Sequence, residues 1–131
     1  MKSQSPHLIF VSCYQSDLPE VGNARNHYDL LDQLRLLSVP YMEAIGCYKG
    51  KEEHTIILEG QYARVADMIM REYNQESYLE HHNDRQCDIV YANGARDRIG
   101  EMQEVSEQEA RKLDAWTSVT SDKGVRFFTV K

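Results

Sequence analysis

The stretch AIGCYKGKEEHTIILEG, residues 44–60, predicts a β-hairpin whose strands are residues 41–48 and 53–59 and whose turn is Lys49-Gly50. Apolar and β-branched runs on both sides of a short glycine turn are typical of paired strands. Two side chains are unusual there. Tyr48 lies at the tip, where a large aromatic gains little from burial, and the charged Glu59 follows three apolar residues. These two residues are the first candidates for a functional site.

The segments around the hairpin complete a β-α-β-β-α-β order. Further strands are expected at 7–14, 77–82 and 87–92, helices at 24–37 and 62–74, a short helix within 104–116 and a closing strand at 125–131. This order is that of the ferredoxin-like split βαβ fold. It predicts an α+β fold in which both helices cover one face of an antiparallel sheet. The length of 131 residues fits one domain, residues 1–131.

The expected hairpin register separates Tyr48 from Glu59. If Lys49-Gly50 is the turn, Tyr48 pairs with Lys51 and Glu59 lies opposite Pro40. At about 3.3 Å per residue, the two side chains are then on the order of 25 Å apart. They cannot share a small ligand within one chain, but they can across a head-to-tail interface, most simply in a trimer. The alternative is that the two residues are unrelated, a tyrosine packed on a turn and a solvated glutamate.

Composition excludes several classes of protein. The net charge of −6 and the pI of about 5.3 argue against a broad contact with nucleic acid or with an anionic membrane surface. The N-terminal apolar run is too short for a signal peptide, and no stretch approaches the ~20 apolar residues of a membrane helix. Three widely spaced cysteines do not fit a disulfide framework, so we expect small buried thiols and a cytoplasmic location.

The sequence contains no motif for a metal or a nucleotide cofactor. In LEHHNDRQCD, residues 79–88, the adjacent His81 and His82 point to opposite faces of a strand and cannot share a metal without distortion. His27 and His54 are isolated in the sequence, so we expect polar surface roles for both. There is no GxSxG, P-loop or GxGxxG pattern. We therefore expect no cofactor and no metal.

Three segments resemble the phage-encoded S-adenosylmethionine hydrolases, better described as S-adenosylmethionine lyases. They are VSCYQSDLPEVGNARNHYDLLDQLR, GCYKG followed by EEHTI, and VYANG followed by MQEV. The matching residues are Ser12, Ser16, Leu18, Asn23, Arg25, His27, Gly46-Cys47-Tyr48, Glu52-Glu53, Thr55, Val90-Tyr91-Ala92, Gly94 and Gln103-Glu104-Val105. The similarity is weakest from Glu59 to Asp88, so it supports Tyr48 more firmly than Glu59.

The resemblance implies a PII-like homotrimer that binds S-adenosylmethionine between subunits and acts in the cytoplasm of an infected bacterial host. Family members release 5′-methylthioadenosine and homoserine lactone, or homoserine, and deprive the host of its methyl donor, which opposes restriction. Tyr48 and Glu59 are the expected catalytic residues, Tyr48 with the support of this resemblance and Glu59 from its place at the end of the hairpin strand. The expected substrate-binding residues are Ser12, Tyr14, Ser16, Tyr91 and Gln103.

Two mechanisms and two non-enzymatic functions remain open. In the lyase mechanism the substrate's own carboxylate attacks its γ-carbon, and the protein contributes mainly positioning and exclusion of water. In the hydrolase mechanism a water attacks and needs a general base, for which Glu59 is the best candidate. A PII-like module that binds an adenosine ligand without turnover is a further alternative. An acidic DNA mimic ranks lower, because the carboxylates are mixed with fifteen Lys and Arg.

Overall fold

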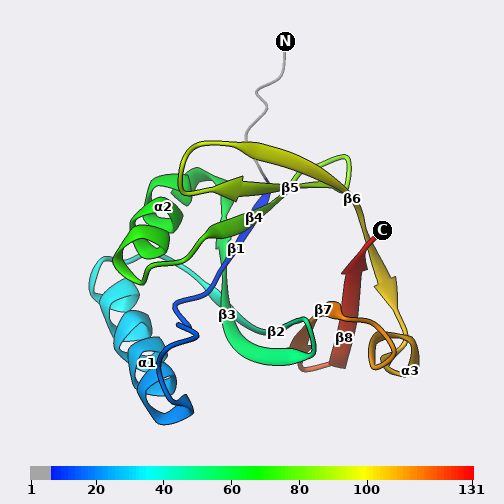
Figure 1. Ribbon diagram of the computed structural model, residues 1–131, viewed down its shortest axis with the longest axis horizontal. Coiled ribbons are helices and arrows are strands. Elements are labelled where there is room, and N and C mark those ends of the chain that lie inside the picture. Colours follow the sequence, from blue (N-terminus) through cyan, green and yellow to red (C-terminus); the bar gives the residue numbers. More distant parts are fainter. Residues whose placement is uncertain (1–6) are drawn as a thin grey trace.

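The computed structural model describes residues 7–131, whose strands form a closed antiparallel barrel (Figure 1). The strands are β1 (Leu8–Val11), β2 (Met42–Tyr48), β3 (Lys51–Glu59), β4 (Ser77–His81), β5 (Gln86–Tyr91), β6 (Arg96–Val105), β7 (Ala115–Ser121) and β8 (Gly124–Val130). The helices are α1 (Glu20–Leu36), the 3-10 turn η1 (Gly60–Tyr62), α2 (Ala63–Glu72) and α3 (Glu107–Ala110). Around the barrel the order is β1-β3-β2-β7-β8-β6-β5-β4, and β4 pairs with β1 to close it.

The predicted ferredoxin-like, PII-like architecture is wrong, because the sheet does not end after its first four strands. β5 and β6 extend it beyond β4, and β7 and β8 extend it beyond β2, until β6 and β8 meet. β6 and β7 were not predicted. The sequence of β6, RDRIGEMQEV, is rich in charge and its first four residues are exposed, so it lacks the apolar alternation that signals a strand. Closing the ring leaves no unpaired edge.

The β2–β3 hairpin has the predicted register. Tyr48 pairs with Lys51, and the ladder continues to Met42 opposite Ile57. Lys49 and Gly50, at the two central turn positions, have φ of 54° and 79°. Positive φ at both positions is typical of the type I′ turn, whose twist matches that of paired strands. The turn therefore sets which hairpin side chains face the inside of the barrel.

The two longer helices lie side by side outside one part of the barrel (Figure 1). Leu30, Leu31 and Leu34 of α1 are buried with Ile69 and Met70 of α2. They pack in one core with outward-facing residues of β1 and β3. The three leucines recur at the three-to-four spacing of a buried helix face, whereas Leu37, which continues that spacing, is exposed. None of the helices within residues 7–131 is both long and apolar enough to cross a bilayer.

The start of α1 differs from the prediction. The helix was expected at residues 24–37, but it begins at Glu20, and Asn23 is buried inside it. Its side chain bonds the preceding loop: Oδ1 accepts from the Gln15 backbone N–H at 2.8 Å, and Nδ2 donates to the Gln15 carbonyl at 3.0 Å. Asn23 thus fixes the loop that follows β1.

A second, smaller core lies under α3. It contains Cys47 of β2, Trp116 of β7 and Phe127 of β8, packed against Ala110. The short helix expected within residues 104–116 is α3, and the Ser106 hydroxyl caps it by accepting from the Glu109 backbone N–H at 3.1 Å. Here α3 covers the outer wall of the strands that close the barrel.

Candidate functional site

A cavity of about 820 Å³ lies inside the barrel and is lined by residues from all eight strands. Apolar side chains from the strands include Phe10, Leu79, Ile89, Met102 and Phe128. Residues 12–17, which follow β1, and residues 74–77, which lead into β4, add polar groups at one end. A mostly apolar cavity with a few polar groups, of this size, is typical of small-ligand sites.

Four of the seven predicted site residues line this cavity: Ser12, Tyr14, Ser16 and Tyr48. The first strand was expected to reach residue 14, but β1 ends at Val11, and residues 12–16 form a loop. The loop nevertheless brings them to the same end of the barrel as Tyr48.

Ser12 and Tyr14 are held by the protein's own hydrogen bonds. The Ser12 hydroxyl donates to the His54 carbonyl at 3.1 Å and accepts from the Tyr14 backbone N–H at 3.0 Å. The buried Tyr14 donates its hydroxyl proton to Glu20 at 3.0 Å. Burial and this bond raise the pKa of Tyr14, so it stays protonated. Both residues shape the rim, whereas Ser16 is exposed at it.

Tyr48 has a different environment. It is the last residue of β2, and 66% of it is exposed. The Lys49 ammonium lies 5.3 Å from the centre of its ring, within cation–π range. An exposed tyrosine on a cavity rim can hydrogen-bond a ligand without breaking a core contact, so Tyr48 is well placed for binding.

Glu59 lies at the other end of the barrel. It is the exposed last residue of β3, where it pairs with Leu8, and it does not line the cavity. Eight steps along β3 separate it from Lys51, the partner of Tyr48, which is about 25 Å of strand. One chain therefore does not bring Tyr48 and Glu59 together.

Tyr91 and Gln103 also lie outside the cavity lining. The Tyr91 hydroxyl donates to Asp97 at 3.0 Å, and this bond raises the pKa of Tyr91. Gln103 is exposed on β6, opposite Thr129 of β8. The structure therefore gives neither residue a place beside Tyr48 within the cavity.

Sequence reasoning missed Glu53. It pairs with Gly46, two positions along the ladder from the Tyr48–Lys51 pair, and it lines the cavity. Burial raises the pKa of its carboxyl; the charge of Lys51 opposes this rise, and Glu20 adds to it. Strand alternation could have found Glu53, because it has the same parity as the buried Thr55. It is a carboxylate at the Tyr48 end of the barrel.

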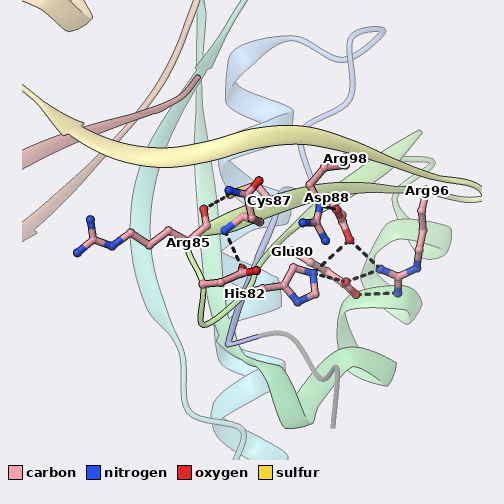
Figure 2. A network of polar contacts seen from close by, with 9 residues as sticks. Glu80, His82, Arg85, Cys87, Asp88, Arg96 and Arg98 are labelled. Carbon is pink, nitrogen blue, oxygen red and sulfur yellow. Dashed lines mark hydrogen bonds and ion pairs between the residues drawn. The ribbon is translucent and has the colours of Figure 1, made fainter. Parts of the chain in front are cut away.

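The histidine-rich segment between β4 and β5 belongs to an ion-pair network (Figure 2). Glu80, 2% exposed, accepts two bonds from Arg96 at 2.6 and 3.2 Å. Asp88 accepts from Arg98 at 2.5 Å and lies 3.2 Å from His82. The His81 ring instead lies 5.9 Å from the ring of His7. The buried charges of this network are paired with one another, so we assign the network a structural role.

The comparison with protein families gives a match to this chain. The model of the S-adenosylmethionine lyase family matches residues 9–130, which include the whole barrel except Leu8. The comparison with curated proteins found no match. Because the match covers nearly all of the chain, from β1 to the end of β8, the chain belongs to the S-adenosylmethionine lyase family.

Proposed function

We propose that this chain converts S-adenosylmethionine to 5′-methylthioadenosine and homoserine lactone. The family match over residues 9–130 carries the proposal, because it names the substrate and the reaction class. The barrel cavity supports it further, since its volume and its polar rim suit a nucleoside with a charged tail.

The reaction needs no nucleophile from the protein. A carboxylate oxygen of the substrate attacks its γ-carbon, the bond from that carbon to sulfur breaks, and the electron pair leaves with sulfur as a neutral thioether. The protein folds the methionine tail into the attack conformation and excludes water. This suits a cavity whose strand-derived lining is largely apolar.

In this proposal Tyr48 and Glu53 bind the charged methionine tail of the substrate. The Tyr48 hydroxyl bonds the tail at the rim, and the Glu53 carboxylate attracts the α-ammonium. Burial makes an unpaired Glu53 carboxylate costly, and a bound cation offsets that cost. Ser12, Tyr14 and Ser16 line the adenosine side of the rim.

In this proposal the Glu59 that acts on the substrate belongs to a neighbouring subunit. Its position at the far end of β3 excludes it from its own chain's Tyr48 site, so it can act only across a head-to-tail contact. A homotrimer is the simplest closed ring of such contacts. Tyr91 and Gln103, which do not line the cavity, stay proposed contacts for a part of the substrate that extends beyond the cavity rim.

The biological consequence we propose is removal of the methyl donor in the cytoplasm of a bacterium infected by a phage, which opposes restriction and modification. The resemblance to phage enzymes supports this role. Hydrolysis to homoserine and ligand binding without turnover are the alternatives.

Incubation of the pure chain with S-adenosylmethionine, followed by chromatography, tests the proposal. We expect 5′-methylthioadenosine to form well above the spontaneous rate. Binding of S-adenosylmethionine without product would support the binding module instead, and neither binding nor product would reject both functions.

A further inference from the structure

We propose that His27, Glu43 and His54 form a binding site for a divalent transition-metal ion, with Zn²⁺ as the best fit. The three residues come from α1, β2 and β3, and one potential ligand atom of each lies within 4.8 Å of the other two. His27 Nε2 lies 3.1 Å from Glu43 Oε1, close to the separation of two ligands around a tetrahedral zinc with bonds of about 2.0–2.1 Å. The two imidazole rings lie 4.7 Å apart.

The chemistry of the three groups suits zinc. Two imidazoles and one carboxylate are the donor set of many zinc sites that keep a position open for water. Nitrogen donors also favour Zn²⁺ over Mg²⁺.

The imidazole of His27 costs folding free energy that an apolar side chain at the same position would not. It is fully buried, and within residues 7–131 its Nδ1 has no hydrogen-bond partner. An apolar side chain of similar size would fill the same space without leaving a buried polar atom unsatisfied. The nitrogen of His27 that is proposed to bind the ion is the other one, Nε2, which lies 3.1 Å from Glu43 Oε1, while the ring stacks on His54.

The cluster is accessible from outside the barrel. A surface hollow of about 480 Å³ is lined by Glu43 and His54 together with Ser118 and Thr120 of β7. This hollow gives an ion a path to the site and room for water ligands. The residues that line it are not those of the barrel cavity, so metal binding and breakdown of S-adenosylmethionine can be measured separately.

The network of Glu80, His82 and Asp88 shows what distinguishes the proposed site. Its ligand atoms are equally close, but Arg96 and Arg98 already occupy both carboxylates and supply the positive charge (Figure 2). Within residues 7–131, by contrast, no Lys or Arg forms an ion pair with Glu43. We therefore expect a cation to bind the first cluster and not the second.

Calorimetric titration of the untagged, chelator-treated chain with Zn²⁺ tests the proposal. We expect one ion per chain, a higher melting temperature with Zn²⁺ and no comparable effect of Mg²⁺. Glu43→Gln and His54→Gln, at positions that are not buried, should each weaken binding about tenfold or more, since even outer partners of metal ligands are worth 10–100-fold. His82→Gln, the matched control, should bind Zn²⁺ like the wild type.

Three results would overturn the proposal. They are no saturable Zn²⁺ binding by the wild type, undiminished binding by both Glu43→Gln and His54→Gln, and loss of binding in His82→Gln. Because Glu43→Gln and His54→Gln change residues outside the core, circular dichroism of each variant shows whether a weaker signal reflects the site or the fold.

Discussion

Tyr48 and Glu59 lie at opposite ends of strand β3: Tyr48 pairs with its first residue, Lys51, and Glu59 is its last. Tyr48 stands at the rim of the barrel cavity, whereas Glu59 lies beside Leu8 and does not line it. A reaction that uses both side chains on one small substrate therefore needs two subunits.

Mixing two impaired variants tests the shared site. Tyr48→Phe and Glu59→Gln chains are each expected to have strongly reduced activity, but a mixed trimer restores any site that combines an intact Tyr48 with an intact Glu59. For random exchange of equal amounts, about one quarter of the sites recover. The measurement is the rate of methylthioadenosine formation after mixing. No recovery, once mass spectrometry has shown mixed trimers, would contradict the shared site.

Replacing Tyr48 by phenylalanine should lower kcat about tenfold with little change in melting temperature. The loss corresponds to one hydrogen bond of about 1.5 kcal/mol, and the exposed ring makes few core contacts. Tyr28→Phe, an exposed tyrosine on α1 that does not line the cavity, is the control and should keep full activity. Equal rates for both variants would remove Tyr48 from the chemistry.

Glu53→Gln should stabilise the free protein more at pH 8 than at pH 4. Burial raises the pKa of Glu53 in the folded state, so its stabilising contribution is full below the unfolded pKa and is lost as pH rises through the folded value. Glutamine does not titrate and avoids that loss. Urea unfolding at both pH values measures the difference, with Glu52→Gln, an exposed neighbour, as the control.

The same Glu53 variant should also raise KM for S-adenosylmethionine, because it removes the carboxylate proposed to attract the α-ammonium. A residue that costs stability but aids function is typical of a binding site. Unchanged KM together with higher stability would show that Glu53 is costly without serving the substrate.

Arg96→Met should destabilise the fold by about 2 kcal/mol. The change leaves the buried Glu80 carboxylate without the arginine that donates two hydrogen bonds to it. Because Arg96 is half-exposed, the loss of stability should be smaller than for a fully buried ion pair. Chemical denaturation measures it. Arg35→Met, which breaks an exposed pair with Asp32, should stay within about 0.5 kcal/mol. Adding Glu80→Gln to Arg96→Met should recover part of the loss.

The first half of the chain was predictable because its signals are local. The Lys49-Gly50 turn fixed the β2–β3 register, and the leucine spacing of α1 identified its buried face except for Leu37, which is exposed. Barrel closure was not predictable in this way. It depends on β6, a charged strand with little alternation, and on its long-range pairing with β8.

The candidate site shows the same division. Tyr48 could be found from its place in a turn and from the family resemblance. Strand alternation could have placed Glu53 on the face of Thr55, but only the barrel shows that this face lines a cavity. The contact between His27 and His54 could be predicted even less from local sequence. These residues are 27 positions apart, and the packing of α1 on β3 stacks their rings.

Analysis of the first-formed product tests the central claim most directly. The chain is incubated with S-adenosylmethionine in ¹⁸O-labelled water, the early products are separated, and their masses are determined by mass spectrometry. We predict methylthioadenosine together with homoserine lactone that contains no ¹⁸O, followed by slow conversion of the lactone to homoserine. Homoserine that carries ¹⁸O at the γ-hydroxyl and forms before any lactone would contradict the lyase mechanism.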